Sequence, residues 1–103
     1  MSMHVIEVLL PLDTGRGEPI PVETIEGLVA GLADRFGGAT AYTREPADGL
    51  WKRATTIERD RIIVIEVMVE HVDDAWWSDY RHRLESEFEQ ESILIRATAC
   101  RTL

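Results

Sequence analysis

The chain has 103 residues, a length that suits one domain with a single hydrophobic core. Its formal net charge of −8 repels phosphate backbones, so we expect no nucleic acid among its partners. The single cysteine, Cys100, excludes an internal disulfide and a cysteine-based metal cluster, and no apolar run approaches the length of a membrane span. We therefore expect one domain over 1–103 that is cytoplasmic, does not contact a membrane, and uses no metal or cofactor; the N-terminus also lacks the basic start of a signal peptide.

The first half of the chain predicts a strand, a helix and a second strand. Residues 4–12 alternate in the manner of a strand, and the Asp-Thr-Gly-Arg-Gly segment 13–17 ends it. That segment lacks the lysine and hydroxyl ending of a phosphate-binding loop, so we interpret it as a surface loop. An apolar stripe of helical spacing then follows Pro21 and runs to Phe36, where Gly37 and Gly38 stop the helix. Residues 39–44 predict a short strand.

The segment 61–72, with the sequence R-I-I-V-I-E-V-M-V-E-H-V, predicts the longest strand. A turn at 46–49 and extended residues between 50 and 57 lead into it. Its odd-numbered side chains are apolar from Ile63 to Val69, whereas its even-numbered set mixes apolar residues with Glu66 and Glu70. We expect one fully buried face and one partly covered face, and therefore a central strand, because an exposed edge this apolar would aggregate.

A second helix and a last strand complete the chain. Asp73 or Asp74 can cap the helix, and its inward stripe runs from Trp76 and Trp77 to Phe88. The two tryptophans are neighbours and cannot both point fully inward, so one is either open to a partner or partly buried at the helix start. Residues 93–103 predict the last strand, with Arg96 and Thr98 on its more polar face.

The order strand, helix, strand, strand, helix, strand predicts an α+β fold of the ferredoxin-like βαββαβ type. Right-handed crossovers and a hairpin between the second and third strands give a four-stranded antiparallel sheet of order 4-1-3-2, with both helices on one face.

The motif Arg35-Phe36-Gly37-Gly38-Ala39-Thr40, followed by Gly49-Leu50-Trp51 and by Asp60 before the long strand, resembles a group of small uncharacterised bacterial proteins. The resemblance covers the middle third of the chain. It implies a ferredoxin-like domain that often associates with itself, and it implies no chemistry.

The sheet face without helices is the first candidate site. Strand alternation places charged side chains there from three strands, namely Glu7, Glu66, Glu70 and Arg96. Crowded carboxylates beside an arginine can hold a polar ligand or act as a general acid or base. The alternative is that they form cross-strand pairs on a solvated or self-associating face, and we favour this alternative.

A second candidate is a pocket formed by the glycine turn and two aromatic side chains, Gly37, Gly38, Tyr42 and Trp51. The same residues also serve as a helix stop and a core plug, which we favour. His71, Asp73 and Asp74 cluster at a strand end, but capping explains the aspartates better than metal binding does. Cys100 has no recognisable histidine partner for a nucleophilic role.

We therefore expect a non-catalytic binding or assembly module that forms a homodimer through the open sheet face. The alternative is a small cofactor-independent enzyme that uses Glu66 or Glu70 as an acid or base beside Arg96 on a polar metabolite, an analogy drawn from similar folds. Regulatory binding of a small polar ligand at a subunit interface is a third hypothesis.

Overall fold

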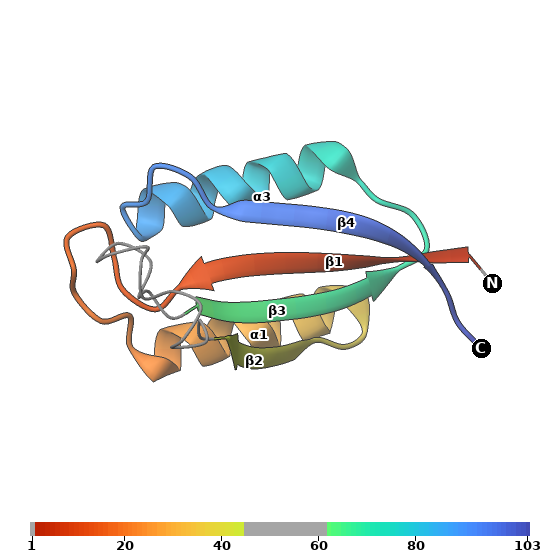
Figure 1. The fold of residues 1–103 in the computed structure, drawn as a ribbon, viewed down its shortest axis with the longest axis horizontal. Helices are drawn as coiled ribbons and strands as arrows, with labels where there is room; N and C mark the ends of the chain where they lie inside the picture. Colours follow the sequence, from red (N-terminus) through yellow and green to blue (C-terminus); the bar gives the residue numbers. More distant parts are fainter. Residues whose placement is uncertain (1, 45–61) are drawn as a thin grey trace, which may run out of the picture.

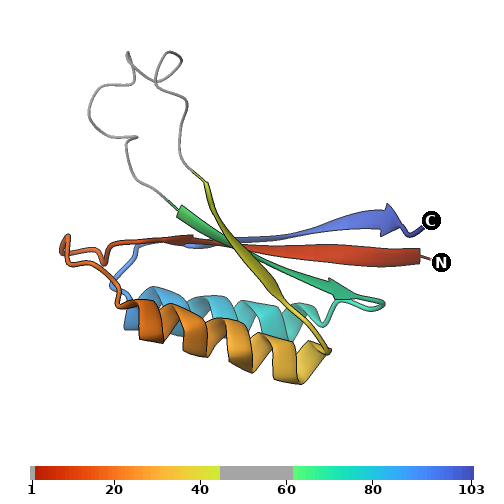
Figure 2. The same cartoon turned by 90° about the horizontal axis from the view of Figure 1, so that it is seen from below.

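The structure is a computed structural model that describes residues 2–44 and 62–103. Its elements are β1 (Ser2–Pro11), α1 (Val22–Phe36), β2 (Thr40–Arg44), β3 (Ile62–Val69), α3 (Asp74–Glu87) and β4 (Leu94–Arg101). In this part of the chain the strands form one antiparallel sheet in the order β2-β3-β1-β4 (Figure 1). Both helices lie on one face of the sheet (Figure 2), so the predicted ferredoxin-like βαββαβ arrangement is confirmed.

The core lies between the sheet and the two helices. The odd-numbered side chains of β3 supply Ile65, Val67 and Val69, all buried, with Ile63 packed at the margin. This is the face that the alternation of 61–72 predicts, and β3 is an inner strand, paired with β1 on one side and β2 on the other. β-branched side chains suit such a buried pleated surface, and each contributes about 1.5–3 kcal/mol when fully buried.

The helix boundaries follow from the predicted capping residues. Pro21 has extended backbone angles and precedes α1, and Gly37 ends it in the left-handed conformation at φ 84° with its N–H donating to the carbonyl of Ala33. At the start of α3, the Asp73 carboxylate accepts a hydrogen bond from the N–H of Trp76 at 3.1 Å. Glycine adopts the left-handed conformation at a helix C-terminus without strain because it has no Cβ atom, and an aspartate carboxylate at the N-cap satisfies a free backbone N–H.

The two neighbouring tryptophans differ in burial. Trp77 is buried and stacks on Phe36 with centroids 5.1 Å apart. Trp76 is half-buried, packs edge-on against Phe36 at 5.2 Å, and carries the guanidinium of Arg35 at 4.5 Å from its ring centroid. Partial burial at the helix start, rather than an exposed tryptophan, is therefore what the structure shows.

Strand ends differ from the sequence prediction by a few residues. β1 begins at Ser2 because it pairs with the end of β4, where Ser2 lies opposite Arg101. β3 ends at Val69, because the chain bends at 70 to enter the helix that Asp73 caps. The predicted turn at 46–49 and the extended residues 50–57 lie outside the described residues. Within residues 2–44 and 62–103, no helix is long and apolar enough to cross a membrane.

Candidate functional site

The open face, which is the sheet face away from the helices, carries a row of polar side chains across all four strands. The pairing register aligns Thr40 with Glu66, Glu66 with Glu7, and Glu7 with Arg96. We call these four residues the polar row. The predicted placement of Glu7 between Glu66 and Arg96 is therefore correct in register, and the row crosses the middle of β1.

Glu7 and Arg96 form an ion pair on this row. Arg96 Nε donates to Glu7 Oε1 at 2.7 Å, and the side chains are 44% and 15% exposed, respectively. The arginine is therefore partly solvated, and a pair of this kind contributes about 0.2–1 kcal/mol. Glu7 is the more sensitive member of the pair. Its side chain is only 15% exposed, and a carboxylate with so little contact with water needs a partner to remain charged at low cost.

Glu66 lies directly opposite Glu7, and like charges opposite one another destabilise a sheet. Each carboxylate has a partner on its outer side. Glu66 Oε2 accepts a hydrogen bond from the hydroxyl of Tyr42 at 3.0 Å, while Glu7 faces Arg96. The two carboxylates are thus flanked by two donors, Tyr42 and Arg96, and two carboxylates with one guanidinium leave the polar row one negative charge.

The alternative in which Glu66 or Glu70 lies beside Arg96 does not match this geometry. Glu7 is the carboxylate that contacts Arg96, and the strand carrying Glu7 separates Glu66 from it. Glu70 lies beyond the end of β3 and is exposed, and its main-chain carbonyl lies 3.3 Å from His4 Nδ1. Alternation predicts the face of a residue but not the point at which a strand stops.

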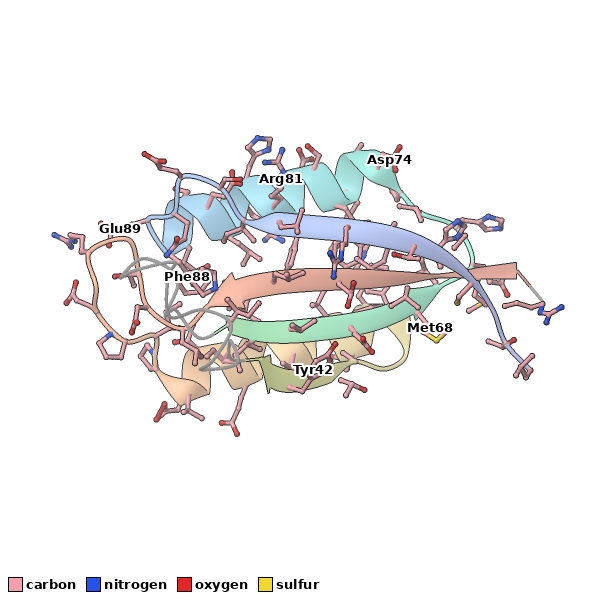
Figure 3. The ribbon with its side chains drawn as sticks, viewed as in Figure 1. Tyr42, Met68, Asp74, Arg81, Phe88 and Glu89 are labelled. Atoms are coloured by element: carbon pink, nitrogen blue, oxygen red, sulfur yellow. The ribbon has the colours of Figure 1, made fainter. Side chains whose placement is uncertain are left out.

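Apolar side chains flank the polar row on both sides. On one side the register aligns Leu94, Leu9, Val64 and Tyr42 across the sheet, and on the other it aligns Val5 with Met68. Leu94 is 51%, Met68 42% and Tyr42 40% exposed. Val64 is fully buried although it belongs to the open face, and it is absent from the core cluster beneath the helices. Figure 3 shows Tyr42 on β2 and Met68 near the end of β3.

The predicted pocket around the glycine turn is not assembled by the described residues. Gly37 and Gly38 end α1, whereas Tyr42 turns to Glu66 on the open face. Trp51 lies outside the described residues. The alternation of residues 40–44 is the signal that places Tyr42 on the open face, and its contact with Glu66 is one that the sequence analysis did not predict.

The glycine loop at 13–17 uses its backbone donors within the protein. The N–H of Gly15 donates to the carbonyl of Phe88 at 3.0 Å, and the N–H of Gly17 donates to the carbonyl of Thr14 at 2.8 Å. The Arg16 guanidinium lies 3.0 Å from the carboxylate of Glu89. The loop is thus held against the end of α3, and its N–H groups do not converge on a phosphate.

Metal ligands do not gather in the described ranges, where no group of three or more histidine, cysteine, aspartate or glutamate side chains could hold an ion. Of the predicted cluster, Asp73 caps α3 and His71 is exposed. A cleft that the sequence did not indicate lies between β4 and the start of α3, with a volume of about 290 Å³. This is at the lower limit of ligand pockets, and its lining includes Asp74 and Arg81, which Figure 3 labels.

Comparisons with known proteins add a likeness of fold. No protein-family model matches the chain, and no curated protein matches its sequence. A solved phage SAM lyase in complex with S-methyl-5'-thioadenosine is similar in structure, with a TM-score of 0.58 and 11% sequence identity over 93% of this chain and 80% of that one. At that identity, the likeness supports the ferredoxin-like fold alone.

Proposed function

We propose that the chain is a self-associating binding or assembly module that uses the open face of its sheet to contact a second copy. The observation that carries this proposal is the exposed apolar surface beside the polar row, where Leu94 is 51% exposed and shares a cross-strand position with Leu9. Apolar area gathered on one face and interrupted by a few paired polar groups is typical of a protein interface.

Two copies of this open face can pack against each other as two sheets do. Two sheets pack face to face at about 10 Å, with the side chains of their inner faces interdigitating. Leu94 and Leu9 share one cross-strand position and would supply apolar contact beside the Glu7–Arg96 pair. The helices already cover the other face, so among the residues that the structure describes the open face is the one that association can bury.

The proposal is tested by placing a charge on the open face. Leu94→Glu should weaken self-association at least tenfold, because a carboxylate would then be buried in the interface. Val22→Glu is the matched control: Val22 is an apolar residue 65% exposed at the start of α1, and its replacement should leave the mass unchanged. Sedimentation velocity measures both variants. Equal behaviour of the two variants contradicts the use of this face.

A second candidate function is binding of a cationic metabolite at the polar row. Two observations favour it: the excess of carboxylates over guanidinium on that row, and Tyr42 held beside Glu66 by a hydrogen bond. The phage protein of similar structure is a SAM lyase, solved with S-methyl-5'-thioadenosine. SAM is a sulfonium cation, and a carboxylate and an aromatic ring are groups that attract such a cation.

Calorimetry with SAM and with S-methyl-5'-thioadenosine tests this candidate. If the row binds the sulfonium, SAM binds more tightly than the neutral thioether, and Glu66→Gln removes that difference. Glu70→Gln is the matched control, because Glu70 lies outside the row and its replacement should leave the affinity unchanged. No heat with either compound, at wild-type protein concentrations that give a dimer, contradicts the candidate while leaving the assembly role in place.

A further inference from the structure

We infer that the second copy is related by a two-fold axis that runs parallel to the strands, midway between β1 and β4, so that Arg96 of each copy faces the partner's Glu7. This inference rests on the proposed self-association and adds its geometry. A two-fold interface is self-complementary, so each residue pair across it occurs twice. The register of the sheet fixes which pairs can meet.

The charge order on the polar row distinguishes the possible axes. Across the sheet the row runs Arg96, Glu7, Glu66, Thr40, from β4 to β2. An axis along the strands between β1 and β3 would stack Glu7 on the partner's Glu66 and gather four carboxylates. An axis perpendicular to the strands, centred on the row, would stack Glu7 on Glu7 and Arg96 on Arg96. Both arrangements bring like charges together in a desolvated interface, which opposes association.

The axis between β1 and β4 instead exchanges those two strands. Each Arg96 then lies over the partner's Glu7. The two guanidinium and two carboxylate groups form a cluster of four charges in which each charge has an opposite charge both beside it and across the interface. Arg96 has donors for this, because its guanidinium carries five N–H groups and its described bond to Glu7 uses the one at Nε. The same rotation places Leu94 over the partner's Leu9, since these residues share a cross-strand position.

The exposure of the side chains favours the same half of the face. On β4, Leu94 is 51% exposed, and Arg96 and Thr98 are also exposed. On β3, Val64 is fully buried and Glu66 is partly buried, whereas Met68 near the strand end is 42% exposed. Because β4 is an edge strand, an axis beside it covers the exposed side chains of β4 and overlaps β1 and β4 of the two copies, with Met68 on β3 and Tyr42 on β2 outside the overlap.

Charge reversal tests the facing pair. Glu7→Arg alone and Arg96→Glu alone should each weaken self-association at least tenfold, because four like charges would meet. An equimolar mixture of the two variants should form a heterodimer in native mass spectrometry. Glu70→Arg makes the same change in net charge beyond the end of β3 and should leave association unchanged. If Glu7→Arg strengthens the dimer, the axis lies between β1 and β3; if the mixture yields no heterodimer although both variants are folded by circular dichroism, the facing pair is wrong.

Cross-linking tests the same axis without altering the polar row. In a Cys100→Ser background, Leu94→Cys would lie about 11 Å from its symmetry mate, measured between Cα atoms, from sheets about 10 Å apart and strands about 4.8 Å apart. Met68→Cys would lie about 18 Å from its mate on the same spacings, because β3 lies one strand farther from the axis. A short bismaleimide should therefore link the first variant and not the second. The reverse result, or equal linking, overturns the inference, whereas a monomeric wild-type chain overturns the proposed function itself.

Discussion

Replacing Tyr80 with phenylalanine removes one oxygen atom from a buried side chain of α3. Tyr80 is 7% exposed, and its hydroxyl is buried and finds no hydrogen-bond partner among the residues that the structure describes. The ring itself is well packed, stacking on Trp76 with centroids 5.1 Å apart. The substitution therefore keeps the apolar contacts and removes a polar group that folding takes out of water.

The expected gain follows from two effects. A buried hydroxyl without a partner costs about 1–3 kcal/mol, so Tyr80→Phe should raise the free energy of unfolding by about 1 kcal/mol near neutral pH. Burial also raises the pKa of the Tyr80 hydroxyl from 10.0 to about 12. The unfolded state therefore loses this proton first, and the wild-type protein loses stability as the pH rises from about 10 to about 12, reaching about 1.4 kcal/mol of loss at about pH 11.

Two assays measure these effects. Urea unfolding at neutral pH and at about pH 11 gives the free energies of the wild type and of Tyr80→Phe, and the variant should lack this alkaline loss. Ultraviolet titration of tyrosinate can assign the ionisation, because the chain has 2 tyrosines and Tyr42→Phe leaves Tyr80 alone. Tyr42→Phe is also the control for stability, since the Tyr42 hydroxyl donates to Glu66 and its removal should give no gain.

A loss of 1 kcal/mol or more in Tyr80→Phe at neutral pH would refute this reasoning, because the hydroxyl would then be making a favourable hydrogen bond. An ordinary tyrosine titration in the Tyr42→Phe variant would refute the burial of the group.

Three further predictions concern stability. Gly15→Ala should destabilise the fold by more than about 2 kcal/mol in urea unfolding, because its Cβ would overlap the carbonyl oxygen of Glu89; an unchanged midpoint would contradict this packing. Gly31→Ala, whose Cβ meets nothing within 4 Å, should stabilise α1 by about 0.5–1 kcal/mol, and a loss would show that the site is occupied. The hydrogen bond from the N–H of Ile93 lowers the pKa of the Glu85 carboxyl, so the ionised carboxylate stabilises the folded state. This stabilisation is present above the pH range where free glutamate titrates and is lost as the pH falls below it. Glu85→Gln should therefore flatten that part of the acid unfolding curve, and an unaltered curve would exclude the contribution.

Sequence periodicity predicted the fold because the segment 61–72 has only one apolar parity that a helix layer can cover. Side chains at Ile65 and Val67 had to face the core, and this choice placed Glu66 on the opposite face. Pairing with β1 then followed from the order of elements, since a chain of this order leaves few right-handed solutions.

The contacts within the candidate site were less predictable than its location. Which carboxylate meets Arg96 depends on the register between β1 and β4, and alternation gives a face without giving a register. The exclusion of Glu70 depends on where β3 ends, which the capping of α3 by Asp73 decides. The contact between Tyr42 and Glu66 depends on the reach of a long side chain across a diagonal position, a distance that no periodicity encodes.

The central claim is that the open face binds a second copy of the chain. Sedimentation equilibrium of the wild-type protein over the micromolar range tests it most directly. We predict a mass that rises with concentration toward twice the chain mass of 11.7 kDa. A mass that stays at 11.7 kDa at every concentration would contradict the claim.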